Sequence, residues 1–225
     1  MLDIYCVFAL IGIITNILVM LINLYEGKGL TFGKNEKLFI ANKVLLIPSI
    51  SILWYFLEEK HNITILLFLI FSWIGDLFLL SDDFIFLILG GISFAASHFT
   101  MIHFYGIHWS LVPFYSYILL LPGTLFLFGS LIPKIKLCGP KDFCVILYCL
   151  ILQLSFASAT ARSYMYPIFH PSFILSYLGY FSFLLSDYFL LSVEMQLTPK
   201  PRRVEIMGFY SLSEILIVLG AIYAI

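Results

Sequence analysis

The sequence predicts an all-α polytopic membrane protein that crosses the bilayer about eight times, and two observations lead to this prediction. The first is composition: of 225 residues, 62% are hydrophobic and only 11% are charged, with a mean hydropathy of +1.05. A soluble globular domain carries roughly 25% charged residues, so a soluble fold could not bury this much apolar surface. The second is the regular succession of long apolar stretches along the whole chain.

Each of these stretches is long enough to cross a bilayer, because a transmembrane helix needs about 20 mainly apolar residues. The predicted spans lie near residues 2–24, 38–57, 63–81, 84–105, 109–131, 142–162, 172–193 and 204–224. Only short gaps separate them, so we expect residues 1–225 to form a single transmembrane domain. Pro48, Pro113 and Pro122 lie inside spans or near their ends, where a proline can mark a kink.

The basic residues predict the orientation of the chain. Nine of the twelve gather around the loops after the first, fifth and seventh spans: Lys28, Lys34, Lys37, Lys134, Lys136, Lys141, Lys200, Arg202 and Arg203. Because lysine and arginine in short loops favour the cytoplasmic side, we expect these loops in the cytoplasm and both termini on the lumenal or exterior side. The membrane would be the endoplasmic reticulum in a eukaryote and the inner membrane in a bacterium. On the opposite side, Arg162 is expected to snorkel from a helix end.

One short pattern occurs twice. Residues 75–80 read GDLFLL and residues 186–191 read SDYFLL, so Asp76 and Asp187 are each followed by x-Phe-Leu-Leu. Four spans separate the two aspartates, so their helices run in the same direction, as a parallel duplication of four helices would require. Chance recurrence in a chain rich in Phe and Leu is the alternative, and the duplication is used only as a hint.

Few ionisable side chains fall inside the predicted spans: Lys43, Asp76, His98, Asp187 and Glu214. Each costs at least about 2.5 kcal/mol in the hydrocarbon core, so each calls for a partner or a function. A rise of about 1.5 Å per residue puts Lys43, Asp76 and Asp187 at one level near the cytoplasmic end of their helices. Glu214 would lie roughly 15 Å in from that side, with Tyr210 one turn nearer the cytoplasm and His98 near or past the midplane.

These residues allow a structural and a chemical interpretation. Lys43 could form a buried ion pair with one aspartate that only fixes helix packing, and His98 could be a neutral histidine bound to a neighbouring helix. One lysine cannot neutralise two carboxylates, however, so two aspartates in one pocket should titrate apart, one protonated and one ionised. That division is what acid–base hydrolysis needs.

Taken in order, these residues resemble the YhhN-like or lysoplasmalogenase family of eight-span membrane proteins. The resemblance rests on Gly75-Asp76, on Phe94 and His98 one span later, on Gly179–Phe183 before Ser186-Asp187, and on the region of Tyr210. Lys43 falls where the family tends to have a lysine in its second helix, whereas Glu214 stands where the family often has glutamine.

The resemblance implies hydrolysis of the vinyl ether bond of lysoplasmalogens, giving a fatty aldehyde and glycerophosphocholine or glycerophosphoethanolamine. It implies a lysophospholipid substrate and a catalytic pair, Asp76 and Asp187. Lys43, His98, Tyr210 and Glu214 would bind the substrate or support the pair. Neither a metal nor another cofactor is required.

A proton-coupled transporter that uses the same intramembrane Asp and Lys groups is the alternative function, and a purely structural membrane protein is the third. The sequence lacks Gly-x-Ser-x-Gly and His-Glu-x-x-His, which disfavours a serine esterase and a zinc protease. No basic tract is longer than Arg202-Arg203, so we expect no nucleic-acid partner.

Overall fold

The computed structural model describes residues 4–27, 33–81, 83–135, 139–197 and 203–224. Within these ranges the chain forms eight long helices and no strand, so the prediction of an all-α polytopic membrane protein is confirmed. The helices are α1 (Ile4–Glu26), α2 (Glu36–Leu57), α3 (Ile63–Phe78), α4 (Phe84–Tyr105), α5 (Phe114–Thr124), α6 (Pro140–Ala161), α7 (Pro171–Glu194) and α8 (Arg203–Ile222).

Seven stretches of helix in the described residues are long and apolar enough to cross a membrane, and α3 is a shorter apolar helix of 16 residues. Helix α3 ends at Phe78, before the expected residue 81, because the chain turns there: the Leu80 and Ser81 amides bond to the carbonyls of Leu77 and Phe78. At about 1.5 Å per residue its length is about 24 Å, so α3 alone is shorter than the roughly 30 Å hydrocarbon core.

The fifth span departs most from the expected 109–131. Residues Trp109–Leu111 form a separate 3₁₀ turn, and α5 begins only after Pro113. Pro122 removes one backbone N–H inside α5, and soon after it the helix continues as a π-helical segment over Leu125–Leu131 and a 3₁₀ turn over Ile132–Lys134. The whole stretch Phe114–Lys134 is still long enough to span.

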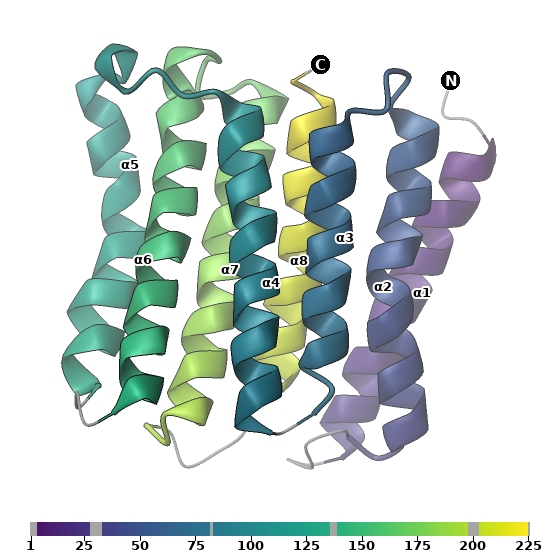
Figure 1. Cartoon of the computed structure of the whole chain (residues 1–225). Coiled ribbons are helices and arrows are strands. Elements are labelled where there is room, and N and C mark those ends of the chain that lie inside the picture. The colour runs from purple at the N-terminus through teal and green to yellow at the C-terminus, as the bar shows by residue number, and fades with distance from the viewer. Residues whose placement is uncertain (1–3, 28–32, 82, 136–138, 198–202, 225) are drawn as a thin grey trace.

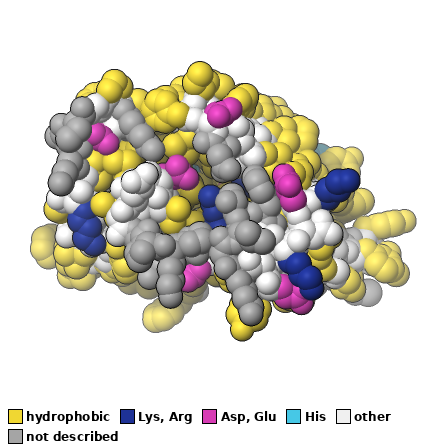
Figure 2. All heavy atoms as spheres, turned by 90° about the horizontal axis from the view of Figure 1, so that it is seen from below, with side chains coloured by type: hydrophobic (Ala, Val, Ile, Leu, Met, Phe, Trp, Pro, Cys, Tyr) yellow, Lys and Arg dark blue, Asp and Glu magenta, His cyan; other side chains and the backbone are white. Residues whose placement is uncertain are grey.

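Both termini lie at one end of the bundle, and the α1–α2, α3–α4, α5–α6 and α7–α8 connections lie at the other (Figure 1). The basic residues Lys34, Lys37, Lys134 and Arg203 belong to this second end, which Figure 2 views with basic and acidic side chains inside a hydrophobic rim. Lys28, Lys136, Lys200 and Arg202, and the side chain of Lys141, lie outside the described residues. Which end faces the cytoplasm stays a prediction.

The packing of the helices supports the parallel duplication. In the first half α1 packs on α2, α2 on α3 and α3 on α4; in the second half α5 packs on α6, α6 on α7 and α7 on α8. One contact between halves repeats as well, because α4 packs on α6 as α8 packs on α2, whereas the contact of α1 with α8 has no counterpart of similar size between α5 and α4. If α1–α4 are matched in order with α5–α8, the neighbour relations within the two halves are the same. The duplication remains a prediction, which this packing supports.

Small residues bring α7 close to α8, as is usual where membrane helices pack. A Cβ added to Gly179 would lie 2.9 Å from the backbone nitrogen of Ile217, so only glycine allows this approach. Two serines of α7 donate hydrogen bonds to carbonyls of α8: Ser172 to Gly220 at 2.7 Å and Ser186 to Ile206 at 2.9 Å. This contact fixes Ser186 against α8 and so sets the direction in which the next residue, Asp187, points toward α6.

Arg162 does not snorkel, so the expectation for this residue is wrong. Its exposed fraction is only 2%, and its guanidinium donates to Ser176 Oγ at 2.6 Å and Ser172 Oγ at 2.5 Å. The same guanidinium lies over the ring of Tyr105, 4.3 Å from its centroid. The hydroxyl and aromatic partners within the bundle replace water around the cation, so the side chain points inward.

Candidate active site

A cavity of about 330 Å³ lies inside the bundle, toward the end that carries the α1–α2 and α7–α8 connections. Six helices line it: α2, α3, α4, α6, α7 and α8. Most of the lining is apolar, and the ionisable and phenolic side chains are Lys43, Asp76, Tyr148, Asp187, Glu194, Arg203 and Tyr210. The cavity therefore combines an apolar wall with a small set of polar groups, as ligand sites do.

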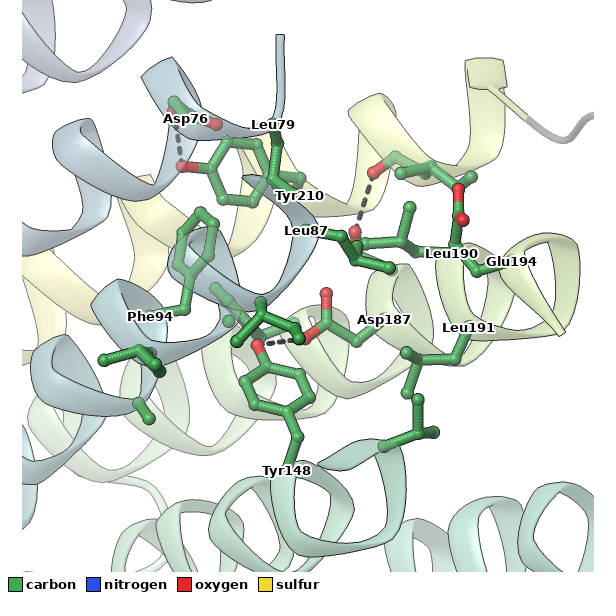
Figure 3. A pocket seen from close by; sticks show the side chains of 18 of the residues that line it. Asp76, Leu79, Leu87, Phe94, Tyr148, Asp187, Leu190, Leu191, Glu194 and Tyr210 are labelled. Carbon is green, nitrogen blue, oxygen red and sulfur yellow. Dashed lines mark hydrogen bonds between the residues drawn. The ribbon is translucent and has the colours of Figure 1, made fainter. Parts of the chain in front are cut away.

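Asp76 lies near the end of α3, where its carboxylate meets two polar partners. The hydroxyl of Tyr210, on α8, donates to Asp76 Oδ2 at 2.7 Å (Figure 3). Lys43 Nζ lies 3.9 Å from Asp76 Oδ1. Lys43 Nζ also donates to the carbonyl of Leu79 at 3.2 Å, just past the end of α3. A cation at a helix C-terminus is favoured by the helix dipole, so α3 itself helps to hold Lys43 beside Asp76.

Asp187 has a different neighbour. The hydroxyl of Tyr148, on α6, donates to Asp187 Oδ2 at 2.6 Å, as Figure 3 shows. In the part of the chain that the structure describes, no lysine or arginine nitrogen lies within 4.0 Å of the Asp187 carboxylate. Both aspartates line the same cavity, and of the two only Asp76 has a cation within 4.0 Å among the described residues.

A cluster of three aromatic rings from α4, α7 and α8 lines the cavity beside the aspartates. The rings of Phe94, Phe183 and Tyr210 lie with their centroids 5.9 to 6.0 Å apart. Phe94 fits because residue 75 is glycine: a Cβ there would lie 2.7 Å from Phe94 Cε2. The structure thus gives a packing reason for the combination of Gly75 and Phe94 next to Asp76.

Of the six predicted site residues, Lys43, Asp76, Asp187 and Tyr210 line the cavity, whereas His98 and Glu214 do not. Both His98 and Glu214 are fully buried. The His98 ring packs edge-on against the ring of Phe183, with the two ring centroids 4.5 Å apart, and Phe183 lines the cavity. Within the described ranges neither His98 nitrogen and neither Glu214 carboxylate oxygen has a hydrogen-bond partner. Their supporting roles remain predictions.

Three ionisable or phenolic residues of the cavity were not predicted as site residues: Tyr148, Glu194 and Arg203. Tyr148 is one of 14 tyrosines, and nothing in the sequence distinguishes it. Arg203 was assigned to a cytoplasmic loop, but it is the first residue of α8 and lines the cavity together with Lys43. Its position directly before the predicted last span, residues 204–224, was the only available signal. Among the described residues, no group of three or more His, Cys, Asp or Glu side chains could hold a metal ion.

Fold and site together define a polytopic helical membrane protein whose interior contains two carboxylates in a largely apolar cavity. The sequence profile of the YhhN family matches residues 38–221, and the chain belongs to this family. The matched range contains both aspartates, their tyrosine partners and the two cations of the cavity. The resemblance inferred from the sequence is therefore confirmed. No curated protein and no solved structure matches the chain.

Proposed function

We propose that this chain is a membrane-embedded hydrolase that cleaves the vinyl ether bond of lysoplasmalogens. The products would be a fatty aldehyde and glycerophosphocholine or glycerophosphoethanolamine. The observation that carries the proposal is the pair Asp76 and Asp187. Both line one mostly apolar cavity, and each accepts a hydrogen bond from a tyrosine hydroxyl. Membership of the YhhN family supports it, because this is the activity that the resemblance implies.

The chemistry needs one acid and one base. The acid protonates the double-bond carbon farther from the ether oxygen, which leaves an oxocarbenium ion at the carbon that carries this oxygen. Water adds to that carbon and loses a proton to the base, forming a hemiacetal. The hemiacetal then breaks into aldehyde and alcohol. Two carboxyl groups on either side of such a cation perform the same division of labour in glycoside hydrolysis.

The neighbours of the two aspartates suggest which group plays which part. Lys43 supplies a cation 3.9 Å from Asp76, which suits a carboxylate that stabilises the oxocarbenium ion and accepts a proton from water. Asp187 has the neutral hydroxyl of Tyr148 as its partner. A buried carboxyl without a cation is better suited to be the neutral acid that donates the proton.

The same cavity offers groups for the remainder of a lysophospholipid. Lys43 and Arg203 both line it and would attract the phosphate of the head group. Apolar residues such as Leu87, Ile88 and Ile151 make up most of the wall and would contact the hydrocarbon chain. One lipid would then be held at both ends, with its vinyl ether between the aspartates.

The test is aldehyde release from lysoplasmenylethanolamine and lysoplasmenylcholine by protein purified in detergent. Asp76→Asn and Asp187→Asn should each lower turnover by about 100-fold or more, the usual contribution of general acid–base catalysis. Asp83→Asn is the matched control, because Asp83 is exposed at the start of α4, makes no capping hydrogen bond and does not line the cavity. Folding is checked by helical circular dichroism and gel filtration. Near-wild-type turnover in either folded variant would refute the mechanism.

A proton-coupled transporter is the second candidate, and a specific observation favours it. His98 and Glu214 are buried beyond the cavity, without hydrogen-bond partners in the described residues, where they could carry protons deeper into the bundle. Transport would appear as flux driven by a pH gradient across sealed vesicles, with no new product. Hydrolysis would release aldehyde in detergent, where no gradient exists.

A further inference from the structure

The wall of the cavity between α4 and α6 reaches the outer surface of the bundle. These helices pack side by side although α5 separates them in sequence (Figure 1). Ile92 on α4 and Leu147 on α6 both line the cavity, yet their exposed fractions are 60% and 49%. Cys144 on α6 is likewise both a lining residue and exposed. Side chains can do both only where a cavity opens at the surface.

We name this opening the α4–α6 slot. It is formed by residues from the middle and one end of the two helices: Leu87, Ile88, Gly91, Ile92, Ala95, Cys144, Leu147 and Ile151. All eight lack a charge, and the slot faces the side of the bundle rather than its end, since it lies along two membrane-spanning helices. Its surroundings in a bilayer are therefore lipid chains.

Gly91 has no packing reason to be glycine. Its neighbour Gly90 has one, because a Cβ there would lie 2.9 Å from two atoms of the Leu79 side chain. A Cβ on Gly91 would meet no atom within 4 Å, although Gly91 lines the cavity. Glycine inside a helix is unfavourable by about 1 kcal/mol relative to alanine. The absence of a side chain at Gly91 therefore does not serve close packing, as it does at Gly90. It leaves open space in the slot.

The charges of the cavity indicate what enters through this slot. Lys43 and Arg203 lie at the polar part of the cavity, and the slot connects this part with the lipid side through an entirely apolar wall. The same part of the cavity also holds Asp76, Asp187 and Glu194. A molecule that satisfies both parts carries a hydrocarbon chain and a head group whose negative phosphate meets Lys43 and Arg203. The cavity volume of about 330 Å³ is at the small end of ligand sites, which run from about 300 to 1,000 Å³. Such a volume favours a lipid with one chain.

We infer that the α4–α6 slot, kept open by Gly91, is the portal for a single-chain phospholipid. The lipid enters sideways from the bilayer, its phosphate reaches Lys43 and Arg203, and its hydrocarbon chain stays in the slot. This inference rests on the proposed function for the identity of the lipid. Gly91 is then a residue that determines specificity, because its lack of a side chain admits a long chain.

The experiment uses a probe that cannot be hydrolysed: a lysophosphocholine with a saturated ether-linked chain that carries a diazirine near its middle. After irradiation in detergent, the label should be found on peptides of α4 and α6 around Gly91 and Leu147. Gly91→Leu should lower labelling by about tenfold, the effect of forcing extra methyl groups into occupied space. Gly12→Leu is the matched control, because Gly12 is exposed on α1 and its Cβ would also meet nothing within 4 Å.

The outcomes separate this inference from the proposed function. Labelling at α4 and α6 that Gly91→Leu abolishes and Gly12→Leu preserves supports the portal, even if wild-type protein releases no aldehyde. In that case the hydrolase proposal fails and the portal stands. If labelling maps to other helices, or Gly91→Leu labels as strongly as Gly12→Leu, the portal is wrong, whether or not the protein hydrolyses lysoplasmalogens.

Discussion

Asp76 and Asp187 stand at equivalent places in the repeated pattern, yet their neighbours differ in charge. In the first half of the chain, α2 supplies Lys43 to the aspartate of α3; in the second half, α6 supplies Tyr148 to the aspartate of α7. Because α2 and α6 are equivalent in the duplicated packing, the lysine and the tyrosine occupy corresponding helices. In the mechanism proposed above, this difference between α2 and α6 is what would separate the base, Asp76, from the acid, Asp187.

Replacing Tyr148 by phenylalanine tests the importance of its hydroxyl. Tyr148→Phe keeps the ring and removes the 2.6 Å hydrogen bond to Asp187, so the carboxyl loses its fixed position. We expect aldehyde release to fall by about fivefold, since a hydrogen bond of this kind is worth about 1 kcal/mol. Tyr177→Phe is the control, because that hydroxyl donates to the carbonyl of Leu119 and lines no part of the cavity. Equal rates in the two variants would contradict the role of Tyr148.

Arg162 should matter for stability rather than for turnover. Arg162→Ala removes two hydrogen bonds to serine hydroxyls and the contact with the Tyr105 ring, and leaves a void inside the bundle. We expect a loss of about 3 kcal/mol, measured as a lower midpoint of thermal unfolding in detergent. Lys60→Ala should leave the midpoint unchanged, because Lys60 is exposed. An unchanged midpoint for Arg162→Ala would show that its bonds add nothing.

At the scale of the helix, apolar length predicted the spans but not their ends. A run of apolar residues tells how much chain prefers lipid, whereas a helix ends where its backbone bonds change. Helix α3 stops at Phe78 although apolar residues continue to Leu80, and α5 starts after Pro113 although Trp109 and Leu111 are apolar. In both places a local turn sets the helix boundary. Hydropathy does not detect such turns, so helix ends are the part of a span that it predicts least well.

The contact between α7 and α8 predicts different results for two glycines. In Gly179→Ala the new methyl group would lie 2.9 Å from the Ile217 backbone nitrogen, which cannot rotate away, so α7 and α8 must separate. We expect a loss of about 1–3 kcal/mol in thermal unfolding. In Gly208→Ala, on α8, the nearest atom is Leu21 Cδ2 at 3.9 Å, so the higher helix propensity of alanine should leave stability equal or higher. Equal loss in both variants would contradict this packing.

At the scale of the whole molecule, the common level of the polar residues was predictable and the extent of the cavity was not. The helical rise placed Lys43, Asp76 and Asp187 at one level, and all three line one cavity. His98 and Glu214 follow the lining residues Phe94 and Tyr210 by one helical turn on the same helix faces, so they are left out because the cavity ends before their depth, which hydropathy does not tell. Tyr148 was missed because nothing in the sequence distinguishes it among 14 tyrosines, and Arg203 because it was assigned to a loop.

The orientation of the bundle gives the last prediction. The described basic residues Lys34, Lys134 and Arg203 belong to the end opposite both termini, so this end should face the cytoplasm. In a variant whose four cysteines are replaced by alanine, Lys60→Cys should react with a membrane-impermeant maleimide in intact bacterial cells. Lys134→Cys should react only after the cells are permeabilised. The two sites are equally suitable reporters, because both lysines are exposed and lie at opposite ends of the bundle. The reverse labelling pattern would show that the topology is opposite to the predicted one. The Lys43–Asp76 cavity would then lie in the outer leaflet and not in the cytoplasmic one.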